Sequence, residues 1–273
     1  ACLLALVLRE PRGWRALYVV CVLGVGTHIM GDLITSFGTM IFAPFSDARF
    51  GWGTTFIIDL WFSGAIVAGL IASAFWYRSR LPAVAACAVL VAYVGFQAVL
   101  RGRAIEFGVQ HAQSRGLPAA GVTAHPRPVS PFNWTVFVSD ASAHRYAHVN
   151  LVREQPRTFQ PRDGFAAKLD APYMPLATAR WVTRSRYGES AEEQALARAA
   201  WESPALGFMR WFAERPAFDG LTEGSSCAWF LDLRFVNPGR DWVPFRFGAC
   251  REQPGAPWRA YEREGESGRV ALD

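Results

Sequence analysis

The sequence predicts an α-helical membrane domain followed by a small soluble α+β domain. Apolar runs dominate residues 1–100 of the 273-residue chain, although the mean hydropathy of the whole is only +0.11. After residue 131 the pattern changes to short alternating strands and amphipathic helices. We therefore expect a helical membrane domain with an exit helix over 1–116, a Pro/Gly-rich linker over 117–131 and a soluble α+β domain over 132–273.

The helical domain is predicted from three long apolar segments. They run from about 14 to 30, from 54 to 77 and from 81 to 100, and a membrane span needs about 20 residues. Within the second segment, Gly64, Ala68, Gly69 and Ala72 are small enough to let a neighbouring helix approach closely. The chain also opens inside an apolar run, ACLLALVL, which we interpret as the tail of a helix in a longer protein.

The loop charges predict an orientation for a multi-pass protein. If every segment spans, one side carries Arg9, Arg12, Arg15, Arg78 and Arg80, and the other carries Arg49, Arg101 and Arg103. An excess of basic residues marks the cytoplasmic side of a membrane protein. We therefore expect the soluble domain on the non-cytoplasmic side.

The net charge of +5 does not indicate a nucleic-acid partner. Almost all of the positive charge comes from arginine, since Lys168 is the only lysine. Nucleic-acid binding needs basic residues gathered on one face or helix, and these arginines are scattered singly. Membrane lipids are the partners that the apolar segments predict.

The soluble domain is predicted to mix strands and helices. Strands are expected over 132–139, 144–152, 225–235 and 241–249, where β-branched and aromatic residues alternate with polar ones. A helix is expected over 190–201, with Ser190 as N-cap and Glu193 at the capping-box position. A second helix is expected from Ser203 to Pro216.

Two cysteines and two histidines of this domain leave alternatives open. Cys227 and Cys250 fall in two strands and would pair in an oxidising compartment, but two free buried thiols explain the spacing equally well. His144 and His148 share a strand face near Asp140, which allows a metal site. Surface histidines on an edge strand are the commoner explanation.

The most informative polar residues lie in the apolar half. His28 and Asp32 are four residues apart and share one helix face, and Thr35 continues that face. Asp59 lies about five residues into the next apolar segment, at a matching depth. Ionisable groups in membrane segments are costly and usually functional. Imidazole and carboxylate are ligands of zinc and of manganese-type ions, so we predict a divalent metal ion held by His28, Asp32 and Asp59.

Each member of this set also has a structural explanation. His28 could hydrogen-bond a carbonyl at a helix end, and Asp59 could pair with Arg49. Asp32 or Asp59 could instead act as a catalytic general base. In the loop between the segments, Gly38 suits a positive-φ turn. Side chains expected to orient the ligands or a substrate are Thr35, Thr39, Ser46 and Arg49.

The segment HIMGDLITSFGTMIFAPFSDARFGWGTTFIID, from His28 to Asp59, resembles the YdjM-type family of bacterial inner-membrane metal-dependent hydrolases. The resemblance implies a multi-spanning inner-membrane protein. It also implies that part of the site lies in N-terminal motifs that this sequence does not contain. The soluble half is similar to longer members in RPVSPFNWTVFV and in the strand from Asp232 to Phe235.

Two functions follow as hypotheses. The first is a membrane-embedded hydrolase in which the metal activates water, acting on a lipid or lipid-linked substrate near the interface. The second is a non-catalytic, membrane-anchored module whose soluble domain binds a partner while the His/Asp cluster holds helices together. The sequence does not indicate an oligomeric state.

Overall fold

The computed structural model describes residues 2–7, 13–118, 121–160, 162–222, 226–240, 242–253, 255–265 and 268–272. It consists of two compact units, Ala1–Arg101 and Gly102–Asp273. Arg9 and Arg12, on which the predicted orientation partly depends, lie outside the described residues. The first unit is helical and the second is rich in β-sheet, as the coarse fold prediction stated.

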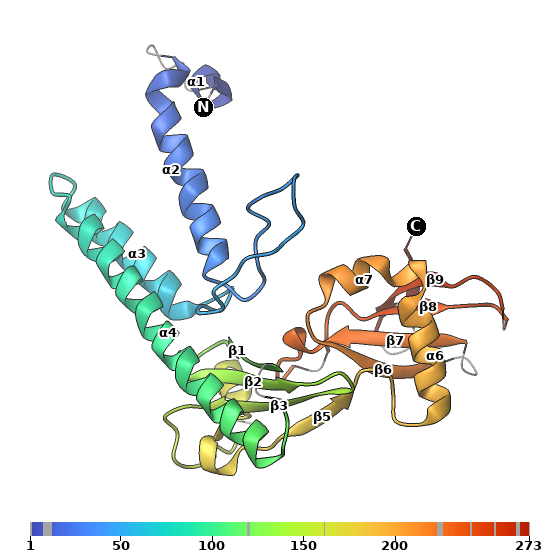
Figure 1. Ribbon diagram of the computed structural model, residues 1–273. Coiled ribbons are helices and arrows are strands. Elements are labelled where there is room, and N and C mark those ends of the chain that lie inside the picture. Colours follow the sequence, from blue (N-terminus) through green and yellow to red (C-terminus); the bar gives the residue numbers. More distant parts are fainter. Residues whose placement is uncertain are drawn as a thin grey trace. The chain divides into compact units, whose positions relative to one another are not determined.

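The first unit contains α1 (Cys2–Val7), α2 (Trp14–Leu33), α3 (Leu60–Phe75) and the start of α4 (Leu81–Ser114) (Figure 1). Within the described ranges, α4 is the one helix both long and apolar enough to cross a membrane. The 16 residues of α3 rise only about 24 Å, less than the ~30 Å hydrocarbon core. Residues 54–59, expected to be helical, precede α3 instead.

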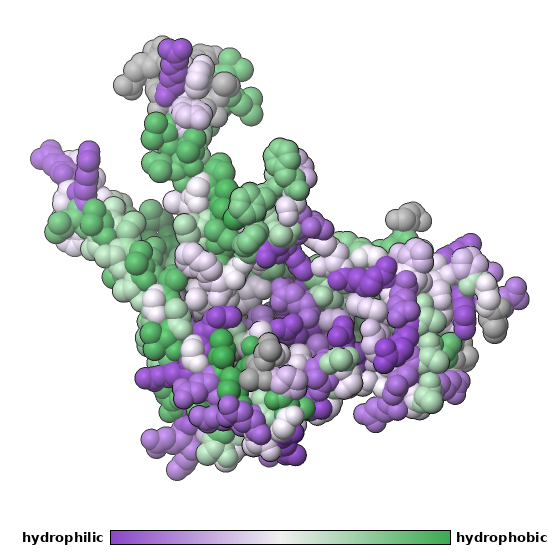
Figure 2. Space-filling model, viewed as in Figure 1, coloured by the Kyte–Doolittle hydropathy of each residue, from purple (hydrophilic) through white to green (hydrophobic). Residues whose placement is uncertain are grey.

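Small residues bring α3 and α4 together. A Cβ atom on Gly69 would lie 2.4 Å from the Cβ of Ala86, so only glycine fits at this crossing. Close approach through small side chains is the usual way in which apolar helices pack in lipid. Gly64, predicted for the same role, has no atom within 4 Å of such a Cβ. Figure 2 shows that hydrophobic residues cover these helices.

The second unit holds two five-stranded sheets. The first consists of β1 (Val122–Pro126), β2 (Asn133–Ser139), β3 (Ala143–Asn150), β4 (Met174–Pro175) and β5 (Val182–Ser185). All of its pairings are antiparallel except the short β3–β4 pair. Strand β1 lies inside the segment predicted to be a linker. The short helix α5 (Phe165–Asp170) lies in the connection from β3 to β4.

The end of α4 packs on this first sheet. A Cβ atom on Gly108 would lie 2.6 Å from methyl groups of Val122 and Val136, so the glycine lets the helix touch β1 and β2. One turn later, His111 stacks on Trp181 with ring centroids 3.8 Å apart. The predicted exit helix is therefore part of the second unit.

The second sheet is antiparallel, with the strand order β10-β9-β8-β7-β6. Its strands are β6 (Pro216–Thr222), β7 (Cys227–Asp232), β8 (Phe247–Cys250), β9 (Arg259–Glu264) and β10 (Gly268–Ala271). The pairing of β7 with β8 places Cys227 directly opposite Cys250, and the two form a disulfide. Of the two alternatives left open by the sequence, the structure has the bonded pair.

Helices α6 (Ala191–Glu202) and α7 (Gly207–Phe212) cover the second sheet. The predicted capping box is confirmed, since Ser190 Oγ accepts from the Glu193 amide and the Glu193 carboxylate accepts from the Ser190 amide. The helix predicted over 203–216 is shorter. Residues Pro204–Leu206 form a 3₁₀ turn, α7 ends at Phe212, and Pro216 begins β6.

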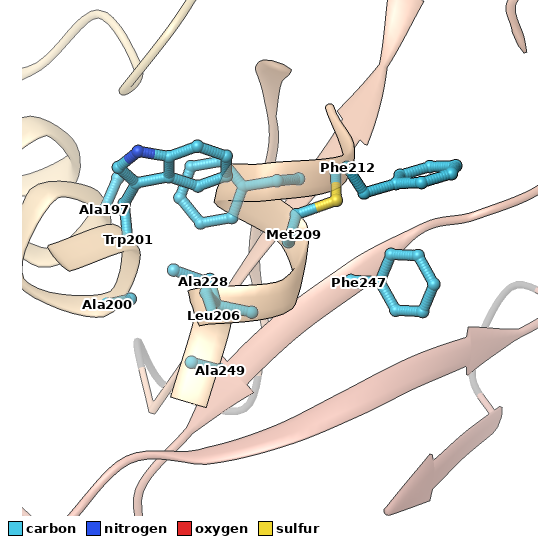
Figure 3. Packing of buried hydrophobic residues seen from close by; sticks show 10 residues of the cluster. Ala197, Ala200, Trp201, Leu206, Met209, Phe212, Ala228, Phe247 and Ala249 are labelled. Carbon is cyan, nitrogen blue, oxygen red and sulfur yellow. The ribbon is translucent and has the colours of Figure 1, made fainter. Parts of the chain in front are cut away.

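The main hydrophobic core lies between these helices and β7 and β8 (Figure 3). Trp201 from α6 packs on Phe230 of β7, with ring centroids 4.9 Å apart. Met209 and Phe212 of α7 fill the space toward Phe247 of β8. Burying a large side chain of this kind stabilises the folded state by about 1.5–3 kcal/mol, so this core stabilises the domain strongly.

Candidate functional site

The C-terminal end of α2 carries the His28–Asp32 pair. Four residues make slightly more than one helical turn, so both side chains leave the same face. His28 Nε2 lies 3.7 Å from Asp32 Oδ2, and the two side chains are 79% and 50% exposed. The prediction that the two side chains share one helix face is confirmed. Their open side leaves room for a third group or a ligand.

After the loop, residues 52–54 return to the end of α2 and donate hydrogen bonds to its carbonyl groups. The last carbonyls of a helix have no partner within the helix. Trp52 N donates to the Leu33 carbonyl at 2.7 Å, and Thr54 N donates to the Ile34 carbonyl at 2.9 Å. Thr54 Oγ1 donates to the same Ile34 carbonyl at 3.0 Å. The last turn of α2, including Asp32, is therefore held by residues 20 positions further along.

Between these points the loop folds on itself. Gly38 has φ +87°, as predicted, and a Cβ there would lie 2.9 Å from the Cβ of Arg49. Thr39 and Phe50 exchange both backbone hydrogen bonds, at 2.8 and 3.0 Å. Ser46 Oγ accepts from the Ala48 amide at 3.2 Å. These contacts make the loop a compact structure, and they give Thr39 and Ser46 roles in its turns.

Two other predicted orienting residues also have local contacts. Thr35 Oγ1 donates to the Asp32 carbonyl at 2.8 Å, so it fixes the backbone of that residue. The Arg49 guanidinium lies over the ring of Phe37, 6.0 Å from its centroid. Thr35 is therefore the predicted residue whose side chain directly supports the His28–Asp32 pair.

Asp59 occupies a different position from the one expected. It is the N-cap of α3, not a residue inside the helix. Its Oδ1 accepts from the amides of Trp61 and Phe62, both at 2.9 Å, and its Oδ2 accepts from Tyr93 Oη at 2.8 Å. A short acidic side chain that receives amide N–H groups is a favoured way to begin a helix. Both oxygens of Asp59 thus have structural partners.

Tyr93 and Gln97 extend this network along α4. Gln97 is 1% exposed, and its Nε2 donates to Tyr93 Oη at 3.3 Å, while its Oε1 is buried without a hydrogen-bond partner. Neither residue was predicted from the sequence. A tyrosine and a glutamine four residues apart in an otherwise apolar helix share one face, and that spacing is the signal that would have found them.

A second set of polar atoms gathers around Gly53, which has φ +62°. A Cβ there would lie 3.5 Å from both Arg101 Nε and Ser36 Oγ. Both atoms are buried without a hydrogen-bond partner in the described structure. Buried polar atoms are normally paired, so the loop end and α4 present unused hydrogen-bonding capacity here.

The ligand atoms of His28 and Asp32 limit the kind of divalent cation that could bind there. Among the described residues no group of three His, Cys, Asp or Glu side chains converges on a metal position. Zinc sites use three or four protein ligands, which the pair does not supply. Magnesium-type ions use one or two carboxylates and complete their shell with water and phosphate oxygens, and carboxylate and water also suit manganese. Asp32 of the exposed pair supplies the one carboxylate that this second class requires, and His28 adds an imidazole nitrogen beside it.

The histidines of the second unit have structural partners instead. Strand β3 pairs on both sides, so the edge-strand expectation is wrong. His144 is 2% exposed; its Nε2 contacts the Pro216 carbonyl at 3.0 Å and its Nδ1 contacts Ser139 Oγ at 2.8 Å. Burial lowers the pKa of His144 to about 4. Asp140 instead accepts hydrogen bonds from Ser142, Ala143 and Arg145.

Comparison with known proteins agrees with the helical part of this description. Residues 1–104 match the family model described as YdjM inner membrane protein. No curated protein and no solved structure matches the chain. The match includes His28, Asp32, Asp59, Tyr93 and Gln97. It ends before the first β-strand at Val122, so the similarity of the soluble half to longer members stays a prediction. Over residues 1–104 the chain is thus similar to the YdjM inner membrane protein family, and the predicted resemblance is confirmed there.

Proposed function

We propose that this protein is a multi-pass inner-membrane hydrolase that uses a divalent cation bound at His28 and Asp32 to cleave a lipid or lipid-linked substrate. The observation that carries the proposal is the pair itself. His28 Nε2 and Asp32 Oδ2 lie 3.7 Å apart at the end of an apolar helix, and both side chains are exposed. Ionisable groups on such helices are costly and are usually kept for function.

The residues around the pair have defined tasks in this proposal. His28 and Asp32 hold the cation, and Thr35 holds the backbone of Asp32 through its 2.8 Å hydrogen bond. The cation would supply Lewis acidity toward a phosphoryl or acyl oxygen and would make a water molecule more acidic. Asp59, with three hydrogen bonds of its own, fixes the start of α3 and positions Tyr93. We therefore remove Asp59 from the ligand set and retain it as a positioning residue.

The disulfide supports the proposed orientation. Disulfides persist in oxidising compartments and are rare in the cytosol, and Cys227 and Cys250 are bonded. We propose that the β-sheet unit lies on the non-cytoplasmic side, as the arginine distribution predicts. Labelling of the reduced cysteines with an impermeant maleimide in intact cells and in inverted vesicles would test this orientation.

Metal content tests the central proposal. The full chain is purified in detergent, loaded with Mn²⁺ and dialysed, and bound metal is measured by mass spectrometry. We expect one ion per chain, lost in His28→Ala and Asp32→Ala and retained in Asp59→Asn. Hydrolysis of p-nitrophenyl phosphate and p-nitrophenyl acetate then separates phosphoryl from acyl transfer. A wild-type chain that binds no ion, or variants that keep it, would refute the proposal.

The second candidate is a membrane-anchored binding module. One observation favours it: Asp59, predicted as a ligand, caps a helix and binds Tyr93, which is the structural role that this hypothesis assigns to the acidic groups. In that case His28→Ala and Asp32→Ala leave metal content and hydrolysis at wild-type levels. The same measurements therefore decide between the two functions.

A further inference from the structure

Arg101 is a charged residue of α4 whose guanidinium nitrogen Nε is buried without a hydrogen-bond partner in the described part of the chain. Ser36 Oγ, in the loop after α2, is buried and unpartnered in the same way. A Cβ atom on Gly53 would lie 3.5 Å from each of these two atoms, so they can be no more than twice that distance apart. Buried polar atoms are normally paired, and we call Ser36, Gly53 and Arg101 the Arg101 site.

The face of α4 that carries Arg101 points into the protein. Tyr93, Gln97 and Arg101 follow one another at four-residue intervals and therefore lie on one side of the helix. Gln97 is 1% exposed, and Tyr93 donates to Asp59 at the start of α3, so protein covers this side. Charged groups of membrane helices that face the protein interior usually mark a substrate or ion path.

The Arg101 side chain has no ion pair, hydrogen bond or ring contact with any residue that the structure describes. Asp59, which contacts the same side of α4, does not neutralise it. Both oxygens of Asp59 accept hydrogen bonds from other groups, namely the amides of Trp61 and Phe62 and the hydroxyl of Tyr93. A partly buried charge without a partner is costly. An anion from outside the chain would supply the counter-charge.

The position of Arg101 along α4 favours a lipid phosphate as that anion. Residues 81–100 contain no charged side chain, and about 20 helical residues rise about 30 Å, which matches the hydrocarbon core. Arg101 is the first residue after this stretch and therefore lies at the level of the lipid headgroups. Trp52, next to Gly53, is 54% exposed, and exposed tryptophan is typical of the membrane interface.

Arg103 shows how an arginine at this level looks without such a site. It lies two residues further along α4 and is exposed, as expected for a long basic side chain that extends into the headgroup region. Arg101 differs because its Nε lies beside Gly53 and Ser36. A guanidinium forms paired charge-assisted hydrogen bonds to two phosphate oxygens, and the Ser36 hydroxyl can donate to a third.

We propose that Arg101 and Ser36 bind the phosphate of a phosphate-bearing lipid, and that this lipid is the substrate class of the hydrolase. The second statement rests on the proposed function and selects phosphoryl over acyl chemistry. Ser36 follows Thr35, whose Oγ1 donates to the Asp32 carbonyl at 2.8 Å. The four residues from Asp32 to Ser36 span at most about 14 Å. A lipid held by its phosphate at Ser36 thus lies near the cation proposed at His28 and Asp32.

Native mass spectrometry of the full chain in detergent, stripped of metal with EDTA, tests the phosphate site by itself. The probes are oleoyl lysophosphatidic acid and monooleoylglycerol, which differ only in the phosphate, together with oleate and inorganic phosphate. We expect each chain to retain one lysophosphatidic acid and to lose the uncharged lipid. Affinity for lysophosphatidic acid should fall about tenfold in Arg101→Gln and by a smaller factor in Ser36→Ala.

Arg103→Gln removes an exposed arginine of the same helix and is the charge control, which should bind the lipid like the wild type. Arg101→Gln should not lower the free energy of unfolding of the lipid-free chain, because its guanidinium has no partner to lose among the described residues. Unchanged binding in Arg101→Gln, an equal loss in Arg103→Gln, or destabilisation of lipid-free Arg101→Gln would overturn the proposal. Oleate or inorganic phosphate bound as tightly as lysophosphatidic acid would overturn it as well.

Metal content separates this inference from the proposed function. With Mn²⁺ added, Arg101→Gln should still bind one ion per chain but should hydrolyse lysophosphatidic acid with a higher KM. In that reaction the bond from phosphorus to the glycerol oxygen breaks, and water supplies the oxygen of the released phosphate. A wild-type chain that binds the lipid and no metal would refute the hydrolase and support the phosphate site. A chain that binds metal and no lipid would refute this inference alone.

Discussion

Replacement of Asp59 tests whether this carboxylate has a structural role. In Asp59→Ala, two amide groups at the start of α3 lose the oxygen that they contact at 2.9 Å. Loss of an acidic N-cap costs about 1 kcal/mol. The variant also removes the 2.8 Å hydrogen bond from Tyr93, and a hydrogen bond to a charged group contributes about 1.5–3 kcal/mol. We expect a total destabilisation of about 3 kcal/mol.

Asp59→Asn separates charge from geometry. Asparagine is as good an N-cap as aspartate, and its side chain still reaches Tyr93. Its cost should therefore be about 1 kcal/mol, from the weaker neutral hydrogen bond. A double-mutant cycle with Tyr93→Phe isolates the side-chain contact, and we expect the two changes to be coupled by about 2 kcal/mol.

The assay is reversible unfolding in mixed detergent and dodecyl sulfate micelles, followed by circular dichroism of the helical signal. A destabilisation of less than 1 kcal/mol in Asp59→Ala, with no coupling to Tyr93→Phe, would refute the structural role. Loss of bound metal in Asp59→Asn at unchanged stability would restore Asp59 to the ligand set.

Three other changes should have measurable effects. Gly69→Leu should separate α3 from α4, because even a Cβ atom at residue 69 would lie 2.4 Å from the Cβ of Ala86. We expect the folded yield to fall several-fold, as measured by size-exclusion chromatography. Gly64→Leu is the matched control. Reduction of Cys227–Cys250, whose positions differ by 23, should cost about 3 kcal/mol through chain entropy, measured by urea unfolding with and without reductant. The pKa of His144, lowered by burial to about 4, means that the unfolded chain takes up a proton first, near its ordinary 6.5. The contribution of His144 to the free energy of unfolding should therefore be fully present above pH 6.5 and fall by about 3 kcal/mol as pH drops toward 4. Urea unfolding at pH 7 and 4.5 checks this, and a flat profile would contradict it.

Local signals in the sequence predicted several elements because each depends on a few neighbouring residues. The capping box at Ser190 and Glu193 and the turn at Gly38 are of this kind. The strands over 133–139 and 143–150 also follow from their alternation. The pairing of His28 with Asp32 follows from helix geometry alone.

Features that depend on distant residues were harder to predict. Asp59 was placed inside a helix because residues 54–58 are apolar or neutral and continue the hydrophobic run. The hydrogen bonds of Thr54 and Thr55 to Ile34 draw this segment back to α2, and α3 can begin only afterwards. Likewise, β3 looked like an edge strand because its neighbour β5 begins more than 30 residues later, after a long connection.

The hydrogen bonds between the end of α2 and residues 52–55 join two segments far apart in sequence into one cooperative unit. The amides of residues 52–55 cannot exchange with solvent without breaking their hydrogen bonds to the carbonyls at the end of α2. Amide hydrogen exchange should therefore show a common opening rate for both segments. A protease that cuts the loop near Phe45, whose side chain is 95% exposed, should release both segments together.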